Sequence, residues 1–322
     1  MTPLRVSVVI PVYSGEMTLP ALVAELARQM DVQRTPQGRE FSISEVLLVW
    51  DRGPGRADEA IRDLAQKHAF VRPIWLSRNF GQHAATLAGM TSSQGEWVVT
   101  LDEDGQMDPA FIGAMLDRAY TDRAQLVYAS PTNPPPHGAS RNLASRLAKW
   151  LFVKVLAGRD FESFNSYRLM HGEIARSVAA YTGQGVYLDV ALSWVVADVA
   201  KEPVVSRDEG RPASNYSLTK LLSHFGRLVV SSGTRPLMFV SIIGAAFVVI
   251  GALLTLWIIA SLVFSNVPVT GWPSTMVAIL IVGGATLLSL GIIAQYVGAA
   301  TNMSLGKPLY VIVSDPEDTY GE

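Results

Sequence analysis

The chain contains no cysteine, and its five histidines are scattered along 322 residues. Without cysteine there is no disulfide, no thiolate nucleophile and no cysteine-ligated zinc, which is typical of proteins from a reducing compartment. The histidines have no His-Glu-x-x-His spacing, so they do not indicate a zinc site. The 26 basic and 28 acidic residues give a net charge of -2. This balance argues against a nucleic-acid partner, which usually requires a basic face.

Two common nucleotide-binding motifs are also absent. No Gly-x-Gly-x-x-Gly follows the first apolar run, and no Gly-x-x-x-x-Gly-Lys-Ser/Thr occurs in the chain. The sequence therefore supports neither a dinucleotide-binding site of the usual kind nor a P-loop. A nucleotide bound by this chain needs another kind of site, and a metal ion that holds its phosphates is the obvious candidate.

Charge is missing from one long region. Between Arg235 and Lys307 there is no Asp, Glu, Lys, Arg or His. Within this region, residues 236–264 and 272–298 are each long enough to cross about 30 Å of hydrocarbon as a helix. The turn that joins them, 266–273, contains two prolines and a glycine. The sequence predicts a transmembrane hairpin of two helices, and the alternative is a buried helical hairpin of a large soluble protein.

The positive charges predict how this hairpin is oriented. Arg227 and Arg235 precede the first span, Lys307 follows the second, and the connecting turn has no positive charge. The positive-inside rule places both ends in the cytoplasm. We therefore expect a multi-pass protein of the cytoplasmic (inner) membrane, with its first 235 residues facing the cytoplasm.

These first 235 residues alternate apolar runs with helical patterns, which is typical of an α/β fold with a mostly parallel sheet. Ligands bind at the carboxyl ends of the strands in such sheets. The loops expected to form a site are therefore 13–16, 51–56, 77–83 and 102–108. The expected strands are 6–12, 43–49, 71–76, 97–101 and 125–129, and the expected helices begin near 18 and cover 58–67, 84–89 and 109–120.

Three carboxylates, Asp102, Glu103 and Asp104, end one of these strands. Neighbouring carboxylates repel one another unless a cation is present, and hard oxygen ligands suit Mg²⁺ or Mn²⁺. The alternative is an acidic turn that precedes the helix beginning at Pro109, with Asp108 as its N-cap. The position at a strand end favours the metal site.

Four segments carry a resemblance to a known family: VSVVIPVYSGE at 6–16, LSRNFGQHAATLAG at 76–89, LDEDGQMDP at 101–109, and the apolar hairpin ending in KPLYVI at 307–312. The soluble part resembles the family 2 inverting glycosyltransferases of the GT-A type. With its tail, the chain resembles polyprenyl-phosphate glycosyltransferases of the dolichol-phosphate-mannose synthase and undecaprenyl-phosphate sugar transferase kind. The resemblance implies a GT-A nucleotide-sugar-binding domain followed by the two-helix hairpin.

The resemblance also implies roles for individual residues. Asp102 and Asp104 are expected to hold Mg²⁺ or Mn²⁺, and Arg141 to orient the lipid phosphate. The family's usual Asp-Asp-Gly-Ser reads Trp50-Asp51-Arg52-Gly53 here. The remaining expected cofactor-binding residues are Pro11, Tyr13, Glu16 and Asp51 for the base and ribose, Arg78 and Asn79 in the second matching segment, Gln106 for the diphosphate, Ser145 beside Arg141, and Arg207, Ser214 and Tyr216 near the diphosphate.

By this resemblance the chain moves a sugar from a UDP- or GDP-linked donor to a polyprenyl (undecaprenyl) phosphate and so supplies a lipid-linked sugar for the cell envelope. A lipid phosphate is already anionic, so no catalytic base is required. Residues 163–168 (SFNSYR) match a family pattern ending in Arg. Asp189 occupies a position where relatives with soluble acceptors carry a carboxylate base.

Other functions fit parts of the pattern. A processive polysaccharide synthase has a similar catalytic domain, but its Gln-x-x-Arg-Trp motif is absent here. A non-catalytic membrane scaffold or regulator, or a transferase for a different lipid, remain alternatives. The chain is expected to divide into a cytoplasmic catalytic domain (1–212), a juxtamembrane interfacial helix (213–235), two transmembrane helices (236–304) and a cytoplasmic tail (305–322). The expected partners are the lipid bilayer, a second copy of the chain in a homo-oligomer, and a separate flippase.

Overall fold

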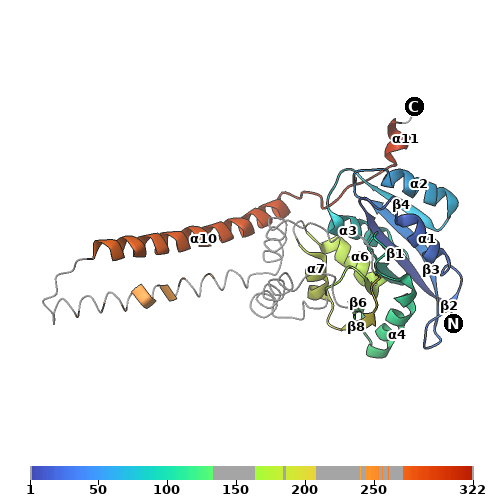
Figure 1. Cartoon of the computed structure of the whole chain (residues 1–322), viewed down its shortest axis with the longest axis horizontal. Helices are drawn as coiled ribbons and strands as arrows, with labels where there is room; N and C mark the ends of the chain where they lie inside the picture. The colour runs from blue at the N-terminus through green and yellow to red at the C-terminus, as the bar shows by residue number, and fades with distance from the viewer. Residues whose placement is uncertain are drawn as a thin grey trace.

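One mixed sheet organises the part of the chain that the computed structural model describes, which is residues 2–132, 164–183, 186–207 and 271–320, with scattered positions between 240 and 260. Its strand order is β8-β6-β7-β5-β1-β3-β4-β9, and β2 pairs with β3 (Figure 1). The strands are β1 Leu4–Val12, β2 Gln33–Arg34, β3 Glu40–Trp50, β4 Val71–Leu76, β5 Trp97–Thr100, β6 Leu126–Pro131, β7 Arg168–His171, β8 Val199–Val204 and β9 Ile312–Val313.

The centre of the sheet is parallel, as predicted. β1 pairs in parallel with β3 and β5, β3 with β4, and β6 with β8. The last seven residues of β1 are all buried. A strand covered on both faces needs such a continuous apolar run, which is why the sequence pattern identified it. The predicted strands are confirmed, with ends shifted by at most three residues and β4 matching at both ends.

Three short strands break the parallel pattern, and the sequence analysis predicted none of them. β7 lies antiparallel between β5 and β6, β9 runs antiparallel to β4, and β2 pairs with β3. The position of β7 matters for the site, because its register pairs Arg168 with Thr100 on one side and Tyr128 on the other.

Helices cover both faces of the sheet. On one face α1, α2 and α4 pack over side chains such as Val8 and Ile10, and on the other α3, α6 and α7 pack over Val9 and Val49. The alternation within β1 follows from the two-residue period of a strand. The helices are α1 Leu19–Ala27, α2 Ala57–Lys67, α3 Gln82–Ser92, the 3-10 helix η1 Pro109–Phe111, α4 Ile112–Asp122, α6 Gly172–Tyr181, α7 Leu188–Val195, α10 Trp272–Ser304 and α11 Pro316–Tyr320.

The long helix α10 projects from the sheet domain (Figure 1). Its segment Ile281–Gly298 is long and apolar enough to cross a membrane, and it is the one segment of this kind among the described residues. The second predicted span is thus confirmed as an apolar helix. The first, 236–264, falls largely outside the described residues, and the hairpin as a whole is therefore not established.

The chain returns to the sheet after α10. Ile312 pairs with Leu76 in the β4–β9 ladder, and the Ser77 N–H donates to the Val311 carbonyl at 3.0 Å. The Arg62 guanidinium donates to both oxygens of Asp315, each at 2.8 Å from its nearest nitrogen. The segment that sequence analysis set apart as a tail therefore contributes an edge strand to the domain.

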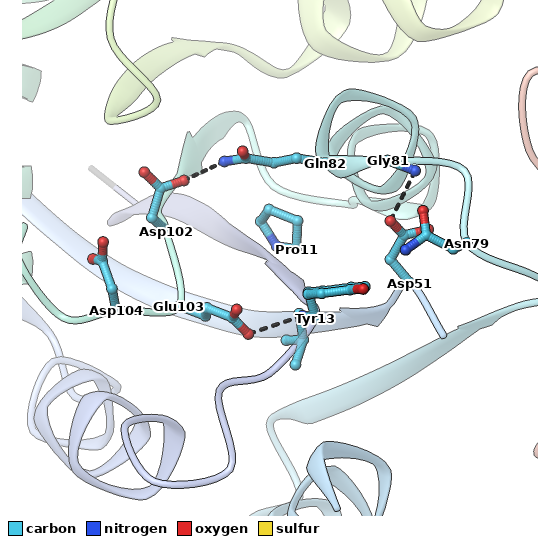
Figure 2. A pocket seen from close by; sticks show the side chains of 10 residues that line it. Pro11, Tyr13, Asp51, Asn79, Gly81, Gln82, Asp102, Glu103 and Asp104 are labelled. Atoms are coloured by element: carbon cyan, nitrogen blue, oxygen red, sulfur yellow. Dashed lines mark hydrogen bonds between the residues drawn. The ribbon is translucent and has the colours of Figure 1, made fainter. Parts of the chain in front are cut away.

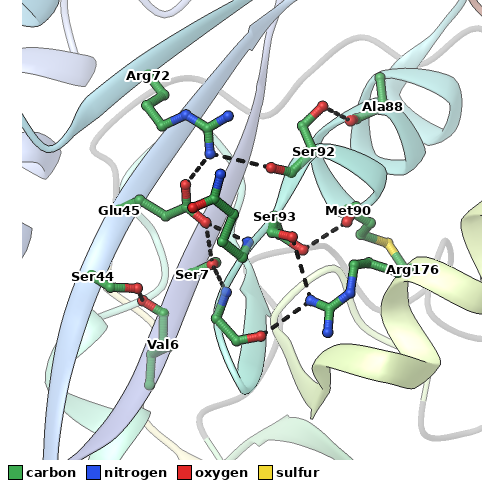
Figure 3. Close-up of polar contacts among 12 residues, drawn as sticks. Val6, Ser7, Ser44, Glu45, Arg72, Ala88, Met90, Ser92, Ser93 and Arg176 are labelled. Atoms are coloured by element: carbon green, nitrogen blue, oxygen red, sulfur yellow. Dashed lines mark hydrogen bonds and ion pairs between the residues drawn. The ribbon is translucent and has the colours of Figure 1, made fainter.

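A buried polar cluster lies toward the amino ends of the strands (Figure 3). The Ser7 hydroxyl and the Gln94 N–H both donate to Glu45 Oε1 at 2.6 Å, and Arg72 pairs with the other carboxylate oxygen. The Gly95 N–H in turn donates to the Ser7 hydroxyl at 2.7 Å. Buried polar groups are tolerated when they are bonded in this way. The cluster ties the turn between α3 and β5 to the sheet, away from the carboxyl ends where the site forms.

Candidate active site

A pocket of about 440 Å³ opens at the carboxyl ends of β1, β3 and β5, where the sequence analysis predicted a ligand site (Figure 2). Its volume lies within the range of small-molecule sites, and its position follows the rule for open α/β sheets. All four predicted loops lie at this edge and contribute to the lining, although 13–16 and 51–56 supply one residue each, Tyr13 and Asp51. The lining residues are Pro11, Val12, Tyr13, Asp51, Asn79, Gly81, Gln82, Asp102, Glu103 and Asp104.

Asp51, directly after β3, holds the loop that follows β4. Its two carboxylate oxygens accept the N–H groups of Phe80 at 2.7 Å and Gly81 at 2.8 Å. Its side chain is buried, which raises the pKa of the Asp51 carboxyl, while these two N–H groups and the Arg78 charge oppose the rise. Each carboxylate oxygen can accept a second hydrogen bond. Asp51 thus fixes the loop and keeps acceptor capacity toward the pocket.

Asp102, two residues after β5, is held by side chains instead. The Gln82 amide donates to Oδ1 at 2.6 Å and the Ser166 hydroxyl donates to Oδ2. Burial raises the pKa of the Asp102 carboxyl, and Ser166, the Arg168 charge and Gln82 oppose that rise. Gln82 begins α3 and Ser166 precedes β7, so three separate parts of the chain meet at this carboxylate.

Glu103 points away from Asp102 and Asp104 (Figure 2). Its carboxylate accepts the N–H groups of Tyr13 at 2.9 Å and Ser14 at 3.1 Å. The predicted cluster of three carboxylates is therefore corrected: Glu103 is occupied in holding the β1 loop. Among the described residues no group of three or more His, Cys, Asp or Glu is arranged to hold a metal ion.

Asp102 and Asp104 remain as the pair that faces the pocket. The Asp104 carboxylate extends toward the Asp102 side chain (Figure 2), and its Oδ1 accepts the Gln106 N–H at 3.0 Å. Two carboxylates fit a site in which Mg²⁺ or Mn²⁺ takes its other ligands from substrate phosphates and water. The donor set thus suits a metal that arrives with a nucleotide.

The alternative interpretation of the acidic turn is correct for Asp108 alone. Its Oδ1 accepts the Ala110 N–H at 2.8 Å and so caps η1. Its carboxylate also pairs at 2.8 Å with Arg207, whose guanidinium donates to Glu25 at 2.9 Å. The Arg207 N–H donates to the Gln106 carbonyl at 2.8 Å. Gln106 therefore belongs to the acidic loop and Arg207 lies beside it, and neither lines the pocket.

The other predicted residues divide into three groups. Pro11, Tyr13 and Asn79 line the pocket with Asp51, Asp102 and Asp104. Arg78 and Glu16 do not: the Arg78 guanidinium lies 4.1 Å from the centre of the Phe80 ring, and Glu16 Oε2 is buried without a hydrogen-bond partner in the described part of the chain. The four that fall outside the described residues are Arg141, Ser145, Ser214 and Tyr216.

Sequence reasoning missed several contributors. Gln82 and Glu103 were within recognised segments but were not assigned to the site. Ser166 lies in the SFNSYR stretch, and its contact with Asp102 depends on β7, which no periodicity indicated. Glu103 was grouped with Asp102 and Asp104 as a strand-end carboxylate because a sequence does not show which way a side chain points.

The stretch Trp50-Asp51-Arg52-Gly53 departs from the family's Asp-Asp-Gly-Ser pattern, and its glycine stands one residue later in the chain. Arg52, at the usual glycine position, has φ +49°, and its guanidinium lies 5.3 Å from the centre of the Trp50 ring. At Gly53 a Cβ would stand 1.6 Å from the Tyr13 carbonyl oxygen. A glycine is therefore required one residue later than usual, where the loops after β1 and β3 touch.

The fold and this strand-end site define a GT-A-like α/β domain. Residues 7–181 match glycosyl transferase family 2, and the chain belongs to that family, as its motifs predicted. It is 26% identical to a bactoprenol glucosyl transferase of Shigella phage SfV, over 98% of this chain and 100% of that protein. It is 29% identical to an undecaprenyl-phosphate 4-deoxy-4-formamido-L-arabinose transferase of Pseudomonas aeruginosa, over 95% of this chain and 89% of that protein.

Solved structures share the fold. A glucosyl-3-phosphoglycerate synthase from Mycobacterium tuberculosis, in complex with Mn²⁺ and UDP-glucose, aligns with a TM-score of 0.52 at 14% identity, over 72% of this chain and 79% of that one. A mannosyl-3-phosphoglycerate synthase from Rubrobacter xylanophilus aligns with a TM-score of 0.51 at 17% identity, over 72% of this chain and 74% of that one. At these identities the likeness concerns the fold.

Proposed function

We propose that this glycosyltransferase moves a sugar, with inversion, from a nucleotide-sugar donor to a polyprenyl phosphate at the membrane surface. The observation that carries the proposal is the Asp102–Asp104 pair at the edge of a pocket in a family 2 fold. The relatives named as bactoprenol and undecaprenyl-phosphate sugar transferases align along nearly their whole length, including the apolar C-terminal region. That full-length likeness supports a lipid acceptor.

The donor's nucleoside would occupy the side of the pocket formed by Pro11, Tyr13 and Asp51. The Tyr13 side chain is about half exposed, which leaves its ring free to pack against a base or ribose. The acceptor capacity that Asp51 retains suits an N–H of the base. Uridine and guanosine both present such groups, so UDP- and GDP-sugars are the proposed donors.

The diphosphate would lie beside Asp102 and Asp104, which would hold Mg²⁺ or Mn²⁺. A divalent ion there supplies electrostatic stabilisation of the charge on the leaving nucleoside diphosphate. The protein's part is to orient the ligands: Gln82 and Ser166 hold Asp102, and the Gln106 N–H holds Asp104. We assign Arg207, which pairs with Asp108 and Glu25 beside the same loop, to the surroundings of the diphosphate.

The acceptor phosphate is already anionic and needs no residue to remove a proton. We assign its orientation to Arg141, whose planar guanidinium suits a phosphate, together with Ser145. Asp189, which occupies the position of a base in relatives with soluble acceptors, is 4% exposed and bonded to Arg168 and Tyr128. It is therefore not placed to deprotonate an acceptor.

The membrane assignment rests on charge and hydropathy. We propose that residues 236–264 and α10 form a two-helix hairpin in the cytoplasmic membrane and that residues 213–235 lie at its surface, with the catalytic domain on the cytoplasmic side. Such a hairpin is too small to form a path for the sugar, so a separate flippase would move the product. Association into a homo-oligomer is part of the same proposal.

The test uses purified full-length protein, a panel of UDP- and GDP-sugars, polyprenyl phosphate and Mg²⁺ or Mn²⁺. The expected result is a lipid-linked sugar from at least one donor, lost in Asp104→Asn with the fold intact. Transfer only to soluble acceptors would overturn the lipid assignment. A protein that neither transfers sugar nor binds nucleotide in a metal-dependent manner would instead be a scaffold that retains the fold.

A further inference from the structure

A buried charged pair lies directly behind Asp102, and the proposed mechanism does not use it. Arg168 and Asp189 are each only 4% exposed, and the Arg168 guanidinium donates to Asp189 Oδ1. The hydroxyl of Tyr128, which is 2% exposed, donates to the same oxygen at 2.9 Å. Ions are seldom buried so completely without a partner, because the interior solvates charge poorly.

A short chain of contacts links this pair to the site. Ser166, whose hydroxyl donates to Asp102, offers its carbonyl oxygen to the Thr100 hydroxyl at 2.5 Å and to Arg168 Nε at 3.4 Å. The antiparallel register of β7 places Arg168 between Thr100 of β5 and Tyr128 of β6. Arg168 therefore lies in β7, the neighbour of the strand β5 whose end carries Asp102. Ser166 connects Arg168 to that carboxylate.

The charges have opposite consequences for a cation at Asp102. The guanidinium is close enough to favour the ionised Asp102 carboxylate. In a poorly solvated layer the same positive charge would repel a divalent ion held by that carboxylate, because Coulomb interactions strengthen as the dielectric constant falls. The negative charge of Asp189 offsets the positive charge that Arg168 would otherwise present to a cation at Asp102. The hydrogen bond from Arg168 to the Ser166 carbonyl stays in place.

We propose that Asp189 is a positioning residue: paired with Arg168, it neutralises the buried guanidinium behind Asp102 and so permits a divalent cation to bind there. This inference rests on the proposed function, because it assumes the metal site at Asp102 and Asp104. It assigns to Asp189 a role different from the carboxylate base that occupies this position in relatives with soluble acceptors.

The test measures Mn²⁺ binding to the full-length protein by electron paramagnetic resonance, without turnover. Asp189→Asn keeps the shape and an acceptor oxygen but removes the negative charge. Its dissociation constant for Mn²⁺ should rise by about 10-fold or more, in the range seen when groups behind metal ligands are altered. Tyr128→Phe, the matched control, removes a contact to the same oxygen without changing charge and should stay within about threefold of the wild type.

A double variant separates charge from structure. Arg168→Met with Asp189→Asn removes both charges and should return Mn²⁺ affinity to within about threefold of the wild type. Ser166→Ala leaves the pair intact and removes the bond to Asp102, together with a long 3.5 Å contact to Asn165, and it should weaken Mn²⁺ binding about 10-fold. If Asp189→Asn alone fails to fold, the Mn²⁺ affinities of these two variants test whether charge compensation behind Asp102 controls metal binding.

The outcomes are distinct. Wild-type Mn²⁺ affinity in Asp189→Asn, with turnover lost, would make Asp189 a base and overturn the inference. Weak Mn²⁺ binding in the folded double variant would overturn charge compensation as its cause. Mn²⁺ binding that is unaffected by Asp102→Asn would show instead that the metal site of the proposed function is misplaced.

Discussion

Asp51 and Asp102 occupy corresponding places in the sheet, each close behind the end of a parallel strand, and both line the pocket. Their partners differ in kind. Asp51 binds two backbone N–H groups of one loop, those of Phe80 and Gly81. Asp102 binds two side chains, Gln82 and Ser166, from different parts of the chain.

This difference indicates a difference in role. Backbone donors cannot withdraw from Asp51 unless the whole loop moves, so Asp51 is part of the architecture that shapes the donor pocket. Side-chain donors hold Asp102 from two sides, one at each oxygen, and each oxygen keeps a further lone pair for a cation. The two aspartates thus divide the site into a fixed side and a metal side.

The largest expected effect is on turnover. Asp102→Asn removes a proposed metal ligand while keeping a side chain of the same shape, so the formation of lipid-linked sugar should fall by about 100-fold or more. The thermal unfolding midpoint should change little, because an amide can still bond to Gln82 and Ser166. Initial rates and a thermal melt of the same preparation check both statements. Wild-type turnover would remove Asp102 from the mechanism.

A substitution at Gly53 tests whether the Asp51 side of the pocket depends on close contact between the loops after β1 and β3. In Gly53→Ala the new Cβ would collide with the Tyr13 carbonyl oxygen, and relief of that overlap should cost about 2–3 kcal/mol of unfolding free energy. Gly38→Ala is the matched control: Gly38 has φ +84° but open space around its Cβ, so only backbone strain of about 1 kcal/mol is expected. Equal losses in denaturant melts would mean that the two loops do not need their close contact.

Asp51→Asn tests the same side through its hydrogen bonds. The asparagine amide would direct one N–H₂ group toward a backbone N–H, and the unsatisfied donor should cost about 1–2 kcal/mol. Nucleotide binding should weaken because the loop that carries Asn79 is released. Asp31→Asn, at an exposed position, should leave both the unfolding free energy and the nucleotide affinity unchanged. A stable Asp51→Asn protein with wild-type nucleotide affinity would contradict the architectural role.

The smallest effect concerns the returning C-terminal segment. Asp315→Asn weakens the bidentate pair with Arg62, and partly exposed pairs contribute only about 0.5–1 kcal/mol. Hydrogen exchange at Ile312 and Val313 should become faster, because β9 pairs only with β4 in the described part of the sheet. Glu317→Gln, whose side chain is 66% exposed, should change exchange less. Equal exchange in both variants would show that Arg62 does not secure β9.

The predictable part of the fold is its parallel centre. β1, β3 and β4 each contain a mostly apolar run followed by a polar loop, so both their existence and the position of the ligand site followed from the sequence. β7 and β9 are short, and nothing in four residues such as Arg168–His171 indicates which neighbours they pair with. Their pairing depends on contacts between distant parts of the chain.

The candidate site divides in the same way. Asp51, Asp102 and Asp104 were predicted because residues behind strand ends must meet at one edge of the sheet. Glu103 was grouped with Asp102 and Asp104 as a strand-end carboxylate, although it points toward the β1 loop, because adjacent residues alternate in direction only within regular structure. Ser166 and Arg168 were not assigned to the metal side, since their place beside Asp102 depends on the register of β7.

The most direct measurement is calorimetric titration of UDP, and of GDP in parallel, into the full-length protein with and without Mn²⁺. In the wild type we expect Mn²⁺ to strengthen binding of the preferred nucleotide. In Asp51→Asn, overall binding should be weaker but the gain from Mn²⁺ should persist, whereas in Asp102→Asn the gain should disappear. A full Mn²⁺-dependent gain in Asp102→Asn, or its loss in Asp51→Asn alone, would contradict the division of the site into a fixed side and a metal side.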